Sequence, residues 1–168
     1  MANQKLKRLT ATALCAALCV VATTFLRIPT ALGYVNLGDA FVLLSGMLLG
    51  PLGGAAAGGI GSGLADLFGY PQYAPVTLVI KAVMALLAAW AAKLADGKRP
   101  AAAIVIRLTG GLLAEAVMVG GYLAYESVLY GLGAAVVSVP FNALQGAVGI
   151  LLASIVYPLV KKPFARLK

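Results

Sequence analysis

Six long apolar stretches follow one another along this chain of 168 residues, separated by short segments that contain Gly, Pro and charged residues. A run of about 20 apolar residues can cross the hydrocarbon core of a bilayer as a helix. Only 11% of the residues are charged, whereas soluble domains carry roughly 25%. We therefore predict an all-α membrane protein, and the length fits a single domain over residues 1–168.

The apolar stretches predict a compact bundle of six transmembrane helices. The second and third stretches are joined only by Gly50-Pro51-Leu52, and this Gly-Pro break favours a hairpin of two short or tilted helices over one long helix. The predicted helices are Thr10–Leu26, Asp39–Gly50, Gly53–Phe68, Pro75–Ala95, Ile104–Tyr125 and Val136–Val160.

The basic residues predict the orientation, because cytoplasmic loops carry an excess of Lys and Arg. If six helices start from a cytoplasmic N-terminus, ten of the 13 basic residues lie on the cytoplasmic side and only Arg27 lies outside. We expect both termini in the cytoplasm, in a multi-pass protein of a prokaryotic plasma membrane. The ten residues are Lys5, Lys7, Arg8, Lys93, Lys98, Arg99, Lys161, Lys162, Arg166 and Lys168.

The residue types disfavour several functions. The chain has no His, which is the usual general base and the commonest metal ligand. Cys15 and Cys19 lie one helical turn apart in an apolar run, where we expect small packing residues rather than a metal site. No basic patch with interleaved aromatics is present, so nucleic acid is not an expected partner. We expect no enzyme activity, metal or cofactor, and no P-loop of an ATPase is present.

Two ionisable residues inside predicted helices mark a candidate site, because charged groups in lipid are costly. Lys81 lies about 9 Å and Glu115 about 15 Å from the outer ends of their helices at 1.5 Å per residue. The two side chains could form a structural ion pair or hold one polar ligand. Tyr122 follows Glu115 and Met118 at helical spacing and shares their face. Arg107, near the cytoplasmic start of its helix, is expected to extend to the interface.

Polar and aromatic residues near the outer ends of the helices extend this site. Aromatics there could belong to the interfacial belt of a membrane protein, but amides accompany them in the same turns. Asn142 and Gln145 in the sixth helix need hydrogen-bond partners, since an unsatisfied amide in lipid is expensive. The predicted substrate-binding residues are Asn36, Tyr70, Tyr73, Lys81, Glu115, Tyr122 and Asn142.

Ala13 and Ala17 in the first helix form an Ala-x-x-x-Ala step. Small residues at this spacing let two helices approach closely in a membrane. The step predicts either a seam inside the bundle or a docking surface for a second membrane protein.

Four segments stand in a distinctive order: residues 36–40 (Asn-Leu-Gly-Asp-Ala), 48–54 (Leu-Leu-Gly-Pro-Leu-Gly-Gly), 61–67 (Gly-Ser-Gly-Leu-Ala-Asp-Leu) and 139–142 (Val-Pro-Phe-Asn), the last followed by Gln145-Gly146. With them, nearly the whole chain resembles the substrate-binding S components of energy-coupling factor (ECF) vitamin transporters. The resemblance implies a vitamin as ligand, and a transmembrane coupling protein and two ATPase subunits as partners on separate chains. It also implies that the S component captures its ligand outside and topples in the membrane to release it inside.

The resemblance also bears on individual residues. S components contact the coupling protein through an Ala-x-x-x-Ala motif in the first helix, which Ala13 and Ala17 match. The family's ligand lies in the outer half, among helices four to six and the outer loops, where Lys81, Glu115, Tyr122 and Asn142 also lie in the predicted bundle.

The substrate is the least determined feature. Residues 36–39 and 140–142 resemble the pyrimidine, pyridoxine and pantothenate group of S components more than the biotin or thiamin groups. We expect a water-soluble vitamin or precursor, with vitamin B6, hydroxymethylpyrimidine or pantothenate favoured over riboflavin. The alternative is a stand-alone proton-coupled carrier of a small organic solute, with Glu115 and Asp66 as the proton-bearing carboxylates.

Overall fold

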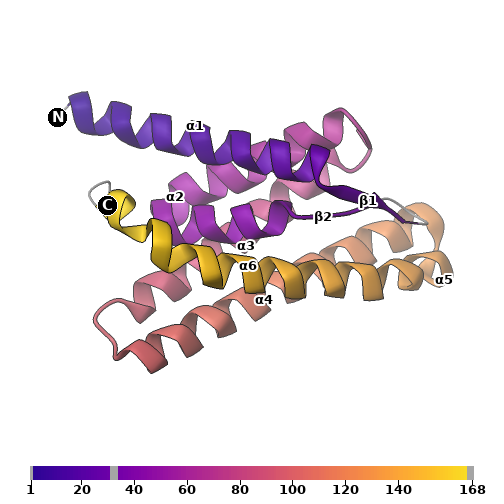
Figure 1. The fold of residues 1–168 in the computed structure, drawn as a ribbon. Coiled ribbons are helices and arrows are strands. Elements are labelled where there is room, and N and C mark those ends of the chain that lie inside the picture. The colour runs from indigo at the N-terminus through magenta and orange to yellow at the C-terminus, as the bar shows by residue number, and fades with distance from the viewer. Residues whose placement is uncertain (1, 31–33, 166–168) are drawn as a thin grey trace.

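Helices make up nearly all of the computed structural model, which describes residues 2–30 and 34–165. The long helices lie alongside one another, and both chain ends lie at one end of the bundle (Figure 1). A two-stranded antiparallel sheet and the short helix α5 lie at the opposite end. In chain order the elements are α1 (Ala2–Phe25), β1 (Arg27–Pro29), β2 (Tyr34–Asn36), α2 (Gly38–Leu67), α3 (Ala74–Ala95), α4 (Pro100–Tyr130), α5 (Leu132–Ala135), the 3-10 helix η1 (Val136–Ser138) and α6 (Val139–Ala165).

The prediction of an all-helical membrane protein is confirmed, but the count of six spanning helices is not. In the described part of the chain, five segments are long and apolar enough to cross a membrane. The difference arises in α2, which takes in both the second and the third predicted helices. The five segments are Asn3–Phe25, Gly38–Leu67, Ala74–Ala95, Pro100–Tyr130 and Leu132–Ala165.

The backbone of α2 reverses direction at the predicted Gly-Pro break. Gly50 has φ 80° and ψ −176°, a conformation that L side chains rarely adopt, and Pro51 follows it. A Cβ atom built on Gly54 would lie 2.5 Å from the Cα of Gly46, whereas a straight helix would separate these residues by about 12 Å. The halves before and after Gly50 extend roughly 18 and 26 Å, each short of the roughly 30 Å hydrocarbon core.

Small residues allow α2 to pack closely against its neighbours α1 and α3. A Cβ atom on Gly46 would lie 2.1 Å from the backbone oxygen of Ala85 in α3. On the other side, a Cβ atom on Gly61 would lie 2.5 Å from the backbone oxygen of Ala16 in α1. Contacts this short leave no room for a side chain, so glycine is required where these backbones meet.

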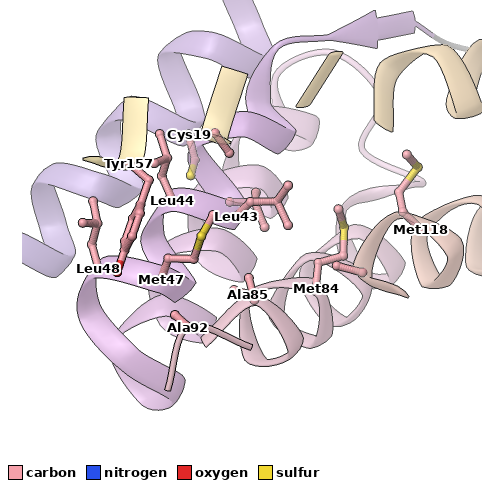
Figure 2. Close-up of a cluster of buried hydrophobic side chains, with 14 of the residues drawn as sticks. Cys19, Leu43, Leu44, Met47, Leu48, Met84, Ala85, Ala92, Met118 and Tyr157 are labelled. Atoms are coloured by element: carbon pink, nitrogen blue, oxygen red, sulfur yellow. The ribbon is translucent and has the colours of Figure 1, made fainter. Parts of the chain in front are cut away.

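A cluster of apolar side chains fills the middle of the bundle (Figure 2). The sulfur atoms of Cys15 and Cys19 form no disulfide and both residues are buried, as expected of packing residues. Large apolar side chains such as Leu52 and Leu159 are instead exposed on the outside of the bundle, the surface that faces lipid in a membrane. The labelled members of the cluster are Cys19, Leu43, Leu44, Met47, Leu48, Met84, Ala85, Ala92, Met118 and Tyr157.

Several boundaries differ from the sequence prediction. The strands β1 and β2 were not predicted, because three residues are too few for an apolar–polar alternation to show. Helix α1 begins at Ala2 instead of Thr10. The residues that precede the apolar run include Lys5, Leu6 and Lys7, which also have high helix propensity, so the helix starts earlier than the apolar run. Two of the basic residues that predict the orientation, Arg166 and Lys168, lie outside the described residues. The side of the membrane on which the chain ends lie stays a prediction.

We predict that Gly46→Ala destabilises the fold by about 1–3 kcal/mol, because the added methyl forces α2 away from the α3 backbone. Gly120→Ala is the matched control: a Cβ atom there meets nothing within 4 Å, and alanine has the higher helix propensity. Thermal unfolding of both variants in one detergent checks this. Equal melting temperatures for the two variants would refute the close packing of α2 on α3.

Candidate functional site

A polar cavity of about 50 Å³ lies at the end of the bundle that carries the sheet. Every long helix contributes to its wall, together with β2 and the connection between α2 and α3. Five of the seven predicted substrate-binding residues are among those that line it. The lining residues are Thr23, Tyr34, Asn36, Ser62, Asp66, Tyr70, Tyr73, Thr77, Lys81, Tyr122, Glu126 and Gln145.

A buried ion pair lies at the inner side of this cavity. The Lys81 Nζ atom in α3 donates a hydrogen bond to Oδ1 of Asp39 in the first turn of α2. Asp39 is fully buried and Lys81 is 3% exposed. Of the two alternatives for Lys81 and Glu115, the structural ion pair is therefore wrong, because depth along two helices does not say which faces meet.

Two amides connect the ion pair to the strand β2. Gln145 Nε2 donates to Oδ2 of Asp39 at 2.7 Å. The backbone nitrogen of Asn36 donates to Oε1 of Gln145, also at 2.7 Å. Asn36 Oδ1 in turn accepts a hydrogen bond from the backbone nitrogen of Gly38 at 2.7 Å, where α2 begins. The expectation that Gln145 needs partners is confirmed, and these bonds join α2, α3, α6 and β2 around one carboxylate.

Glu115 lies behind the ion pair and does not line the cavity. It is 5% exposed, and neither of its carboxyl oxygens has a hydrogen-bond partner among the described residues. Gly146 and Gly149 on α6 make room for it, since a Cβ atom on Gly149 would lie 3.2 Å from Glu115 Oε1 and 3.0 Å from Asp39 Cβ. The Glu115 carboxyl group therefore lies close to α6 beside Asp39.

Tyr122 confirms the predicted inward face of α4. Its hydroxyl oxygen lies 2.9 Å from Oγ1 of Thr77, and the Lys81 Nζ atom lies 5.5 Å from the centre of its ring. Met118, one turn away, is fully buried in the core. This face presents a ring and a hydroxyl beside the ammonium group, a suitable wall for a ring-shaped polar ligand.

A row of tyrosines extends from Tyr122 to the sheet. Ring centres are 6.2 Å apart between Tyr122 and Tyr73, 6.3 Å between Tyr73 and Tyr70, and 5.3 Å between Tyr70 and Tyr34. Such spacing is typical of interacting aromatic pairs. The row offers successive faces against which a flat ligand could stack.

Two carboxylates hold the hydroxyl groups of this row. Tyr34 donates a hydrogen bond to Oδ1 of Asp66. Tyr73 donates to Oε1 of Glu126 at 3.2 Å, and Ser138 donates to Oε2 of the same residue. Glu126 is 5% exposed, so its carboxylate is shielded from solvent where it accepts these bonds. Burial, followed by the nearby Asp66 carboxylate, raises the pKa of Tyr34 above its ordinary value, so its hydroxyl stays a donor at neutral pH.

The remaining predicted residues lie elsewhere. Asn142 is half-buried on α6 and does not line the cavity. Ala13 and Ala17 are exposed, whereas Cys15, Cys19 and Ala22 form the face of α1 that packs into the bundle. The Ala-x-x-x-Ala step is thus not a seam within this chain.

Sequence reasoning missed Asp39, Thr77 and Tyr34 as site residues. Thr77 precedes Lys81 by one helical turn, so it could have been found from the shared face. Asp39 is the first residue of the predicted helix Asp39–Gly50. Only the packing of α2 on α3 reveals that its side chain forms an ion pair with Lys81.

The cavity is small for an organic ligand. Its volume of about 50 Å³ is well below the roughly 300–1,000 Å³ of typical ligand pockets. A ring-shaped ligand would therefore need half-buried side chains such as Tyr34 and Tyr70 to move apart.

Comparison with known proteins gives one family and two relatives. The family described as "ECF-type riboflavin transporter, S component" matches residues 3–162. An "uncharacterized protein in gap 3'region" of Pyrococcus woesei is 39% identical over 135 residues, which cover 80% of this chain and 87% of that protein. The "thiamine precursor transporter HmpT" of Lactococcus lactis subsp. cremoris (strain MG1363) is 28% identical over 166 residues, covering 96% of this chain and 92% of that protein.

We predict that Lys81→Met destabilises the protein by about 3–5 kcal/mol, because it leaves the buried Asp39 carboxylate unpaired. Adding Asp39→Leu should restore much of this loss, since the double variant buries no lone charge. The free energy of unfolding in detergent is measured for Lys81→Met, Asp39→Leu and the double variant. Lys93→Met, at an exposed position, is the control. Additive effects of the two single substitutions would refute the pairing.

Proposed function

We infer the function from the family to which this chain belongs, the S components of ECF-type riboflavin transporters. The chain is a multi-pass membrane component of an ECF vitamin transporter and not an enzyme. We propose that the whole chain, residues 1–168, forms one substrate-binding domain. It captures a vitamin or vitamin precursor and delivers it through a transmembrane coupling protein driven by two ATPase subunits.

The polar cavity is the proposed binding site, and the observation that carries this is the Lys81–Asp39 pair below a row of tyrosines. The pair supplies an ammonium donor and carboxylate acceptors, while Tyr70, Tyr73 and Tyr122 supply stacking faces. Asn36 adds an amide at the rim. Of the other predicted residues, Glu115 lies beside Asp39 at α6, and its unpartnered carboxyl group is the proposed second partner of Lys81 when a ligand engages Asp39.

A small vitamin or precursor is the favoured substrate, in the class of hydroxymethylpyrimidine, vitamin B6 or pantothenate-like compounds, of which the first two are single-ring heterocycles. Two observations support it over a larger ligand. A relative that matches nearly the whole chain transports a thiamine precursor, and the cavity has little free volume. Riboflavin is the second candidate, because the matching family carries that name and a tricyclic ring could use the full row of tyrosines.

We propose that the cavity faces outward and that both termini are cytoplasmic. The chain ends lie together at the end of the bundle away from the cavity (Figure 1). That end also carries Lys98 and Arg99 between α3 and α4, and Lys161 and Lys162 in α6. The positive-inside rule then assigns this end to the cytoplasm.

Ala13 and Ala17 are the proposed contact with the coupling protein. Both are exposed on α1, so their small side chains offer a helix of another chain a close approach. The opposite face of α1 is already occupied by α2, which supports an external partner for this step.

Substrate binding can be tested with riboflavin, pyridoxine, hydroxymethylpyrimidine and pantothenate on the purified protein. We expect one single-ring compound to bind, and Tyr70→Ala to weaken its binding by about tenfold through loss of an aromatic contact. Phe141→Ala, at an exposed position outside the cavity, should leave affinity unchanged. Binding of riboflavin alone would favour the second candidate, and equal affinity in both variants would remove the cavity from the site.

Docking can be tested by replacing Ala13 and Ala17 together with Leu. We expect vitamin binding to persist and ATP-dependent uptake with the coupling module to be lost, because the larger side chains block close helix approach. Ala143 and Ala147 form an exposed Ala-x-x-x-Ala step on α6 and provide the matched control. Loss of uptake in the control pair as well, or uptake without the ATPases, would contradict the assignment.

A further inference from the structure

A second and larger cavity, of about 510 Å³, lies at the end of the bundle that carries the chain ends. The α3–α4 connection, the first turns of α4 and the last turns of α6 form its walls, with two residues of α2. It shares no lining residue with the tyrosine-lined cavity. It therefore needs an explanation of its own, which does not rest on the proposed function.

The charge in this basic cavity is strongly unbalanced. Lys98, Lys161 and Lys162 come from two separate segments, and Arg107 comes from a third. Asp96 is the one acidic residue among the described lining residues. Four cations around one carboxylate repel one another unless an anion lies between them.

Arg107 is the most informative of the four. It lies seven residues after the start of α4, about 10 Å along the helix axis, and it is half-buried. Its guanidinium carbon lies 5.1 Å from the centre of the Tyr157 ring. Within residues 2–30 and 34–165, no carboxylate forms an ion pair with it. A guanidinium at this depth needs a counter-ion, and among the described residues it is an aromatic ring, not a carboxylate, that lies against it.

The remaining wall of the cavity is apolar, which distinguishes it from a site for a free ion. Met47, Ile104 and Phe164 line it beside the basic groups. Outside it, Leu94 and Leu159 are exposed on the helices that border it. An anion attached to an apolar body, held where the helices leave the membrane, fits this combination of surfaces.

We propose that the basic cavity binds the headgroup of an anionic phospholipid from the adjacent leaflet. The phosphate lies between Arg107 and the three lysines, and the acyl chains follow the exposed apolar faces of α3 and α6. Basic pockets between transmembrane helices are suited to anionic headgroups, and Arg offers paired donors to phosphate oxygens.

Native mass spectrometry of the full chain, released from micelles with phosphatidylglycerol or phosphatidylcholine, tests the proposal. We expect the wild type to retain phosphatidylglycerol in preference to phosphatidylcholine. The Lys161→Gln/Lys162→Gln double variant should retain roughly tenfold less phosphatidylglycerol. The matched control, Lys93→Gln/Arg99→Gln, also removes two charges near the same end, but neither residue lines the cavity, so its retention should equal that of the wild type.

Each other outcome overturns the proposal. Equal retention of the two lipids, or equal losses in both double variants, would show only diffuse attraction to positive charge. Displacement of phosphatidylglycerol by millimolar inorganic phosphate would indicate a free-anion site instead of a lipid site. Arg107→Gln should also lose the preference for phosphatidylglycerol; if that variant does not fold, the lysine variants still decide.

Discussion

A lysine buried within membrane-spanning helices must be neutralised by the protein, and this requirement organises the cavity end of the bundle. Lys81 on α3 reaches Asp39 on α2, and Gln145 on α6 donates to the second carboxylate oxygen. Gln145 also accepts from the backbone of Asn36. One ion pair thus connects three helices and the sheet, and Tyr122 lies over its ammonium group. A ligand that competes for either member of the pair would act on all of these elements at once.

The ion pair can form only because α2 and α3 approach closely. Gly46 leaves no room for a side chain against the backbone of Ala85, and the reversal at Gly50 brings both halves of α2 into the bundle. On α6, Gly146 and Gly149 leave the space that Glu115 occupies. Since lipid provides no hydrophobic drive for helix association, these close backbone contacts hold the charged groups in place.

The two ends of the bundle have different chemistry. One end encloses tyrosines, amides and an internally compensated ion pair, which suits a small polar ring. The other gathers basic side chains with a single acidic residue among the lining residues described, which suits an anion supplied from outside the chain. Five residues of the tyrosine-lined cavity were predicted from sequence: Lys81 and Tyr122 from helical depth and spacing, and Asn36, Tyr70 and Tyr73 from the polar and aromatic composition of the outer turns. The basic cavity was not predicted, since its members come from segments that meet only in the folded chain.

The sequence by itself determined that this is a helical membrane protein and which stretches of the chain form its helices, because a bilayer forces apolar runs of a set length. From the Gly-Pro break it also predicted the reversal of α2 at Gly50. It could not determine how each helix is rotated about its axis. Only the tertiary structure decided that Lys81 pairs with Asp39 instead of Glu115, that Glu126 is buried and that Ala13 and Ala17 face outward. These outcomes depend on which faces of neighbouring helices meet, and close packing of small residues far apart in the chain sets that choice.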